Sequence, residues 1–192
     1  DNALATTPHR DNIWFSATGF GHLQADSPYF YQIETHLRFN TTGRIFRQNL
    51  EVVRLGKELN PYVSFVIGST FAPTEFRGPG LSYEQRVWQQ IDLNPPLSVP
   101  DLRLQVYDRM EERWLLNRSS GISLRNRFKI VVTYCKNDWL TCPLLASETF
   151  FNLNHPPWDN SNTLSQQRSF LGLQKSLTTK TLIRAGYLNQ YF

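Results

Sequence analysis

The stretch from Arg127 to Cys142, RFKIVVTYCKNDWLTC, places the tightest constraint on the fold. Four apolar or aromatic residues occupy alternate positions in it: Phe128, Ile130, Val132 and Tyr134. Alternation with a period of two, carried by β-branched and aromatic residues, is typical of a strand with one buried face. We therefore predict a strand here whose apolar side packs into a core.

The same alternation recurs along the chain, with turn residues between the segments. Further strands are predicted over residues 12–18, 27–40, 45–55, 62–71, 83–93, 101–107 and 148–153. Residues 83–93 also suit a short helix, although Val87, Gln89 and Ile91 favour a strand. Residues 108–123 are charged and then Ser- and Gly-rich, and are interpreted as a long excursion. About eight strands at this spacing predict an all-β, antiparallel β-sandwich.

The composition supports a single β-rich domain. The 192 residues include 13 Phe, eight Tyr and five Trp, and 40% are hydrophobic, which is enough for a core. No run of 18 apolar residues occurs, so no transmembrane helix is predicted. We divide the chain into a flexible arm over residues 1–10, a β-sandwich over 11–160 and a C-terminal segment over 161–192.

The C-terminal segment is basic, and its period changes. Phe170, Leu173 and Leu177 suit a helix, with Thr163 or Ser165 as its N-cap. After Asp159 the chain contains four cations and no acid: Arg168, Lys175, Lys180 and Arg184. They would form either a solvated helix face or a membrane-proximal surface that meets anionic headgroups. The folded body shows no basic stripe with interleaved aromatics, so no nucleic-acid partner is predicted.

The two cysteines, Cys135 and Cys142, bracket a short polar turn. Their spacing is not a zinc signature, because no second cysteine pair and no histidine lie at ligand spacing. The prediction is a disulfide that ties the central strand to the segment after the turn. The alternative is two free buried thiols.

Two N-glycosylation sequons occur, at Asn40 (NTT) and Asn117 (NRS). Both fall in predicted turns, which suits glycan acceptors. About two such sequons are expected by chance in a chain of this composition. Only their placement therefore supports glycosylation.

The sequence shows no catalytic or metal signature. It lacks the nucleophile elbow, the zinc-protease helix and the phosphate loop. Its four histidines share no close spacing, and the adjacent Glu111 and Glu112 would face opposite sides of a strand. We predict no enzymatic activity, no catalytic residue, no metal and no cofactor.

Four aromatic residues are predicted near strand ends: Phe76, Trp114, Trp139 and Trp158. β-Sandwiches that bind sugars or apolar ligands present such rings, so these residues are candidates for contact with a ligand or partner. The alternative is that they cover the open ends of the sandwich core.

Three short stretches resemble a known family: Asn12–Ser16 (NIWFS), His22-Leu23 and Ser27–Gln32 (SPYFYQ). They are similar to the entry of the lumenal domain in the GOLD-domain seven-transmembrane family, which includes Wntless. The resemblance implies a lumenal β-sandwich followed by seven membrane helices, with a role in secretory cargo transport or as an orphan receptor. No functional residue is transferred.

The leading hypothesis is a non-enzymatic recognition domain of the secretory lumen or the cell exterior. It would be the ectodomain of a membrane protein that acts in trafficking or binds a protein, lipid or glycan, with its C-terminal end at the membrane. One alternative is a self-assembling jelly-roll subunit of the viral coat type. A second alternative is a carbohydrate-binding β domain.

Overall fold

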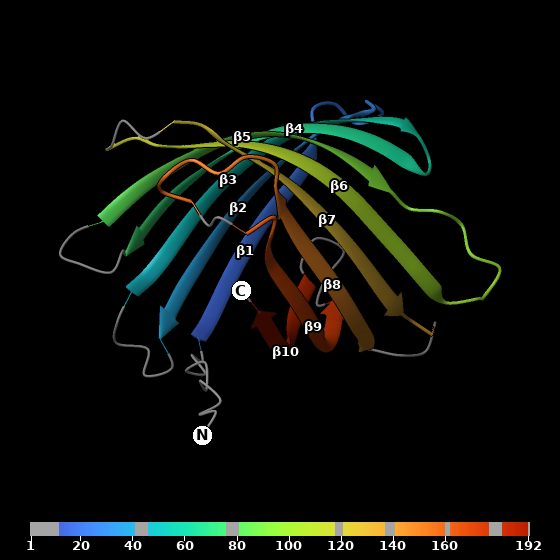
Figure 1. Ribbon diagram of the computed structural model, residues 1–192. Coiled ribbons are helices and arrows are strands. Elements are labelled where there is room, and N and C mark those ends of the chain that lie inside the picture. Colours follow the sequence, from blue (N-terminus) through green and yellow to red (C-terminus); the bar gives the residue numbers. More distant parts are fainter. Residues whose placement is uncertain are drawn as a thin grey trace, which may run out of the picture.

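The computed structural model describes residues 12–40, 46–75, 81–117, 121–136, 141–159, 162–176 and 182–191. Within these ranges the regular structure is entirely β (Figure 1). The ten strands are β1 (Asn12–His22), β2 (Tyr29–Asn40), β3 (Phe46–Asn60), β4 (Val63–Glu75), β5 (Leu81–Leu93), β6 (Leu102–Leu115), β7 (Ser123–Tyr134), β8 (Cys142–Asn152), β9 (Leu164–Ser176) and β10 (Leu182–Tyr191). In this part of the chain no helix has the length and apolar character needed to cross a membrane.

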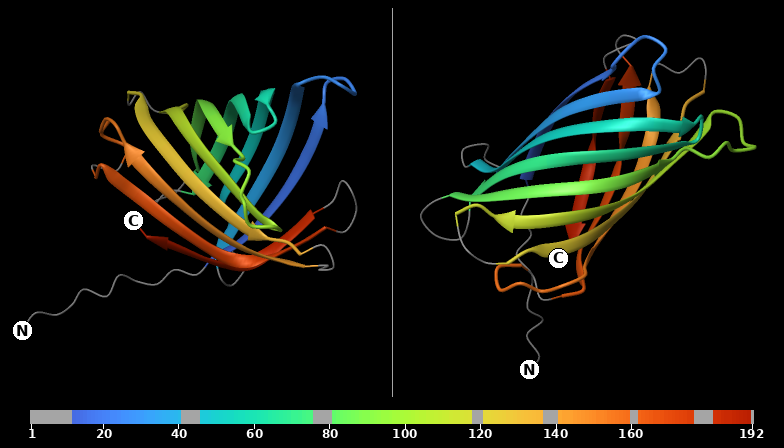
Figure 2. Two further views of the ribbon diagram at one scale, coloured as in Figure 1. Left: turned by 90° about the vertical axis from the view of Figure 1, so that its right-hand side faces the viewer. Right: turned by 90° about the horizontal axis from the view of Figure 1, so that it is seen from above.

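All ten strands belong to one antiparallel sheet in which each strand pairs with the next along the chain. The sheet is strongly curved and forms a half-barrel (Figures 1 and 2). Strands β1 and β10 are the two ends of the strand order. The curvature brings β10 back toward β1 in both figures.

The all-β, antiparallel prediction is confirmed, but the sandwich of eight strands is wrong. The structure has one sheet of ten strands instead of two facing sheets. The consecutive strand order also differs from a jelly-roll, which is built from two Greek keys. The predicted arm over residues 1–10 lies outside the described residues.

The predicted C-terminal helix is also wrong, because β9 and β10 occupy that segment and form an antiparallel pair. The apolar spacing of Phe170 and Leu173 is compatible with a helix, but in the strand these residues project to opposite faces. Phe170 packs toward Val131 and Leu144 on the inner face. Leu173 lies on the outer face and is 54% exposed.

The charged stretch after Asp108 was predicted as an excursion and instead continues β6 to Leu115. Its side chains alternate strictly: Arg109, Glu111 and Arg113 are buried, whereas Asp108 and Glu112 are exposed. A strand with charges on its buried side does not show the apolar alternation that strand prediction uses. The prediction therefore ended the strand too early.

Two apolar clusters lie on the inner, concave face. One joins β2 to β5 and consists of Phe30, Leu50, Val52, Val66, Ala72 and Trp88. The other lies under β7 to β9. Gly68 and Gly56 make room for the first cluster, because a Cβ there would lie 2.2 Å from the Trp88 ring and 2.1 Å from the Phe30 ring. These clusters leave the middle of the inner face to charged side chains.

Candidate functional site

The inner face of the half-barrel carries charged side chains on the strands from β2 to β9, except β4. The buried or half-buried cations are Arg38, Arg54, Arg86, Arg109, Arg113, Arg125, Arg127, Lys129 and Arg168. The acids among them are fewer: Glu34, Glu84, Asp92, Glu111, Glu148 and the connection residue Asp159. Charged side chains are almost never fully buried unless they are paired. This face is therefore the candidate functional site.

Glu111 on β6 is the most deeply buried acid, with 1% of its surface exposed. Arg125 on the neighbouring strand donates two hydrogen bonds to Glu111 Oε2, at 3.0 and 2.5 Å. Arg109 and Arg127 lie 3.7 and 3.6 Å from Glu111 Oε1. One carboxylate thus holds three guanidinium groups from β6 and β7.

Glu148 on β8 is the second centre. Arg127 donates to its Oε1 at 2.6 Å, and Arg168 on β9 lies 3.4 Å from its Oε2. The hydroxyl of Tyr107 also donates to Glu148. Because Arg127 contacts both acids, it links the Glu111 and Glu148 centres across β7.

A third group lies where the β8–β9 connection folds over the end of the inner face. Arg113 donates to Glu84 at 2.5 Å and to Asp159 in the connection at 2.7 Å. Trp158 lies beside Arg113, with its ring centre 5.2 Å from the guanidinium carbon. These contacts fix the connection against β6, and Arg113 is itself held by Glu84 of β5.

The β2 side of the inner face carries its own ion pairs. Glu34 contacts Arg54 and lies 3.0 Å from His36. Arg38 donates to Gln48 at 2.6 Å and lies within electrostatic range of Arg168 on β9. Since β2 and β9 are far apart in the strand order, this proximity reflects the curvature of the sheet.

Aromatic rings support several of the arginines. The guanidinium of Arg109 lies 3.7 Å from the centre of the Trp88 ring, and Arg168 lies 4.7 Å from that of Phe150. Stacking of this kind is worth about 0.5–2 kcal/mol and is stronger when the cation is desolvated. The rings and carboxylates together hold the inner face as a fixed charged layer.

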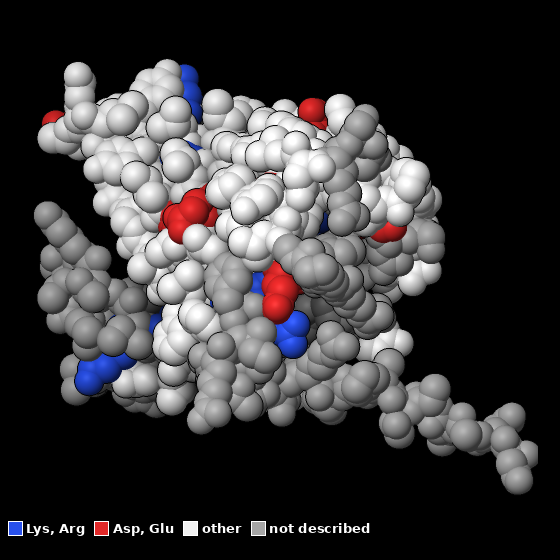
Figure 3. All heavy atoms as spheres, turned by 90° about the vertical axis from the view of Figure 1, so that its left-hand side faces the viewer, with Lys and Arg blue, Asp and Glu red and all other residues white. Residues whose placement is uncertain are grey.

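The outer, convex face has the opposite character. Many large apolar side chains lie on it, and eleven of them are at least 42% exposed: Ile33, Val53, Leu55, Phe65, Ile67, Val87, Ile91, Leu145, Leu171, Leu173 and Tyr187. In the view of Figure 3, the coloured Lys, Arg, Asp and Glu side chains form a few separate groups among uncharged residues. Soluble monomers rarely expose contiguous apolar patches of more than a few hundred Å². In a water-soluble protein the apolar face of a sheet is normally buried and the charged face exposed. This sheet has the reverse arrangement.

This reversal corrects the prediction for the central strand. The alternation of β7 is confirmed, but its apolar side is not in a core: Phe128 and Ile130 are each 38% exposed. The opposite side, with Arg125 and Arg127, is the one that packs inside. The pattern identifies the two faces of a strand, and it does not say which one meets water.

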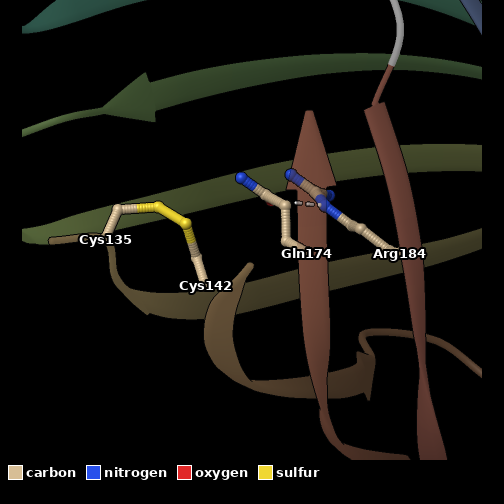
Figure 4. Close-up of a disulfide and its surroundings, with 4 residues drawn as sticks. All are labelled: Cys135, Cys142, Gln174 and Arg184. Atoms are coloured by element: carbon tan, nitrogen blue, oxygen red, sulfur yellow. Dashed lines mark hydrogen bonds between the residues drawn. A yellow bond between two sulfur atoms is a disulfide. The ribbon is translucent and has the colours of Figure 1, made fainter. Parts of the chain in front are cut away.

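The two cysteines are joined as predicted, with their Cα atoms 4.8 Å apart. The backbone N–H of Cys135 donates to the carbonyl oxygen of Asp101, which ties the β7–β8 turn to the β5–β6 connection. Figure 4 shows the disulfide close to Gln174 and Arg184, which are joined by a hydrogen bond of 2.9 Å. The disulfide therefore lies at one end of the inner face.

The predicted basic C-terminal surface is not gathered on one side. Arg168 faces inward to Glu148, whereas Lys175 is exposed on the other face of β9. Arg184 is an exposed residue of β10. Lys180 lies outside the described residues.

Of the four aromatic residues predicted to contact a ligand or partner, the two that the structure describes are not brought together. Trp114 is half-buried on the outer side of β6, opposite Gln85. Trp158 lies at the end of the inner face, where its Nε1 donates to the carbonyl oxygen of Gly121. Phe76 and Trp139 lie outside the described residues.

The two sequons remain predictions. Asn40 ends β2, and its side chain lies outside the described part. Asn117 lies in the turn after β6, and its amide nitrogen donates to the carbonyl oxygen of Leu81 at 3.1 Å. Among the described residues, no group of three or more His, Cys, Asp or Glu side chains could hold a metal ion.

The fold and the inner face together define an antiparallel up-and-down half-barrel with charges inside and apolar residues outside. The chain belongs to the DUF2490 family of proteins of unknown function, whose model matches residues 11–192. An uncharacterized protein of Methylorubrum extorquens is 23% identical over 183 residues, which cover 93% of this chain and 77% of that protein. No solved structure matches the chain. The resemblance to the GOLD-domain family remains a prediction.

Proposed function

We propose that this chain is an integral membrane protein that crosses the bilayer with its strands, as a β-barrel whose outer face contacts lipid. The observation that carries the proposal is the reversal of faces. Water-soluble packing would bury Ile67, Val87 and Leu171 and expose Glu111 and Arg125, and the opposite is found. A hydrocarbon environment makes this arrangement favourable, because outward apolar residues alternate with inward polar ones in membrane barrels.

The strand dimensions support the proposal. A strand of 13 residues such as β4 is about 43 Å long and, at a tilt of about 40°, reaches across roughly 33 Å. The hydrocarbon core of a bilayer is about 30 Å thick. On β4 the outward residues from Val63 to Phe71 include no charge, and the charged outward residue Glu75 lies at the end of the strand.

A second argument concerns the sheet edges. Unsatisfied backbone groups cost several kcal/mol each in hydrocarbon, so open edges do not face lipid. We therefore include in the proposal a pairing between β1 and β10 that closes the barrel. With an even number of strands in an up-and-down order, this pairing is antiparallel. Arg184 of β10 lies within electrostatic range of Glu34, which pairs with Thr18 of β1. This proximity supports closure near Ala17 and Ala185.

The closure gives an expected result for cross-linking. In a background with Cys135 and Cys142 replaced by Ser, the pair Ala17→Cys and Ala185→Cys should form a disulfide on mild oxidation in lipid vesicles. The matched control is Ala17→Cys with Ser147→Cys, an outward residue of β8. Closure would be contradicted if Ala17→Cys and Ala185→Cys did not cross-link under conditions in which neighbouring β9–β10 cysteine pairs do.

The membrane proposal itself is tested by extraction. Membranes from cells that produce the chain are washed with alkaline carbonate and then with 4 M urea. The protein should stay in the pellet and enter solution only with detergent. Release by carbonate would mean that the protein is peripheral and would overturn the proposal.

This proposal and the recognition-domain hypothesis differ in which part of the chain meets the membrane. That hypothesis places the C-terminal end at the membrane, whereas here all ten strands contribute. The disulfide is compatible with an oxidising compartment, where such bonds persist. No enzymatic activity is proposed.

A further inference from the structure

The β8–β9 connection lies against the end of the inner face where β6 ends and β7 begins. We call its described residues 154–159 the cover segment. Asp159 accepts a hydrogen bond from Arg113 at 2.7 Å and one from the hydroxyl of Ser123 at 2.5 Å. The Trp158 ring lies beside the same guanidinium group, with its centre 5.2 Å from the guanidinium carbon. The far part of the cover segment is thus held by two inner-face residues.

The near part of the cover segment is held by Asn154, whose side chain reaches the start of β7. Its Oδ1 accepts a hydrogen bond from the backbone N–H of Leu124 at 2.7 Å, and its Nδ2 donates to the carbonyl oxygen of Ile122 at 2.9 Å. Both bonds go to the backbone, so they do not depend on the charges of the inner face. The two ends of the cover segment are therefore attached independently, and the Asp159 end can leave while the Asn154 end stays.

The side chains under the cover segment are buried although they lie close to the ends of their strands. Ser123 is the first residue of β7 and is 0% exposed, and Arg113, two residues before the end of β6, is 6% exposed. Because Asp159 contacts both of them, the cover segment contributes to their shielding from water.

The Asp159 end of the cover segment is held in a way that allows release. None of the apolar side chains among the described residues of the connection is buried, and Leu153 at its start is 53% exposed. Segments with few buried apolar contacts open locally at a low cost in free energy. Arg113 also donates to Glu84 at 2.5 Å, so release of Asp159 leaves this guanidinium with an anionic partner. Opening therefore avoids the large cost of a buried charge without a partner.

We propose that the cover segment is a lid over this end of the barrel, which opens to admit water and small ions to the charged inner face. In the closed state Asp159 holds Arg113 and Ser123. In the open state Asp159 has left both of them and Arg113 stays with Glu84. Passage of ions rests on the membrane proposal, because it needs a closed barrel in a bilayer, whereas the movement of the cover segment does not.

The movement is tested by thiol labelling of the purified full chain in detergent. In the background with Cys135 and Cys142 replaced by Ser, Ser123→Cys places a single thiol under the cover segment, which should react slowly with a water-soluble maleimide. Asp159→Asn replaces a charged acceptor by a neutral one, so it should speed the labelling about tenfold. The matched control is Asp26→Asn, an exposed acid in the β1–β2 connection, which should leave the rate unchanged. Equal rates in the two variants would overturn the proposal.

The passage of ions is tested by fixing the lid in the closed state. Ser123→Cys with Asp159→Cys, in the same background, joins two side chains that already meet, so mild oxidation should form a disulfide between them. The oxidised protein should carry little current in planar lipid bilayers, and reduction should raise the current severalfold. Ser123→Cys alone should not respond to the reductant. Equal currents before and after reduction of the pair, or no current in either state, would overturn the proposal.

The two proposals fail separately. Carbonate extraction decides whether the chain is an integral membrane protein, and thiol labelling reports on the cover segment without a bilayer. A protein that stays in the membrane pellet but shows no effect of Asp159→Asn on labelling would overturn the lid and leave the membrane proposal standing.

Discussion

Replacing Glu111 by Gln is expected to lower the free energy of unfolding by about 3–5 kcal/mol, the cost of removing one partner from a buried ion pair. The side chain keeps its shape but loses the charge that holds Arg125, Arg109 and Arg127 together. Three guanidinium groups would then face one another around a neutral amide. Denaturant titration of the protein in lipid vesicles, followed by tryptophan fluorescence, measures the change.

The matched control for this variant is the next residue in the chain. Glu112 is exposed on the opposite side of β6, away from the inner ion pairs, so Glu112→Gln should not lower the free energy of unfolding by more than about 0.5 kcal/mol. Similar small effects of both substitutions would show that the inner charges are not held as the structure has them.

Replacing Ile67 by Lys is the second substitution for which we expect a large loss of stability. Ile67 lies in the middle of the uncharged outer part of β4 and is 52% exposed. If this face meets hydrocarbon, a lysine near the bilayer midplane should cost about 2–4 kcal/mol of stability in lipid vesicles. In a water-soluble protein the same exposed substitution would change stability by no more than about 0.5 kcal/mol.

The control for Ile67→Lys is Tyr62→Lys in the β3–β4 turn, which is also exposed. Near the membrane interface the cost of a lysine falls to about 0–1 kcal/mol. Equal stability of the two variants would contradict contact of the outer face with lipid.

The sequence predicts the β class and many strand positions because alternation is a local property. The strands at 27–40 and 62–71 largely coincide with β2 and β4. The disulfide follows from the position of its cysteines at the two ends of one turn. These features depend on residues close together in the chain, which is why pattern reasoning finds them.

The local pattern of residues could not show which face of each strand points inward. The pattern of β7 assigns Phe128 and Lys129 to opposite sides, but the choice of inside depends on the surrounding solvent. Treating water as that solvent placed the apolar side in a core. The alternating charges of Arg109, Glu111 and Arg113 were the available signal, since a strand with charges on one side and an exposed apolar other side suits a membrane barrel.

The inner ion-pair centres depend on contacts far apart in the chain. Tyr107 and Glu148 meet only because β6, β7 and β8 pair in register and the sheet curves. Arg168 was predicted as part of a basic C-terminal surface and instead contacts Glu148. Nothing local in the sequence around Arg168 identifies this partner.

The central claim is that the outer face contacts lipid and the inner face does not, and spin labelling tests it most directly. A nitroxide is attached at each position from Val63 to Phe71 of β4, in lipid vesicles. Its accessibility to oxygen, which partitions into lipid, is compared with that to a water-soluble nickel complex. Oxygen accessibility should peak at Val63, Phe65, Ile67, Ser69 and Phe71 and fall at the positions between them, with the highest ratio at Ile67. Outward positions that are as accessible to the nickel complex as Tyr62 would contradict the claim.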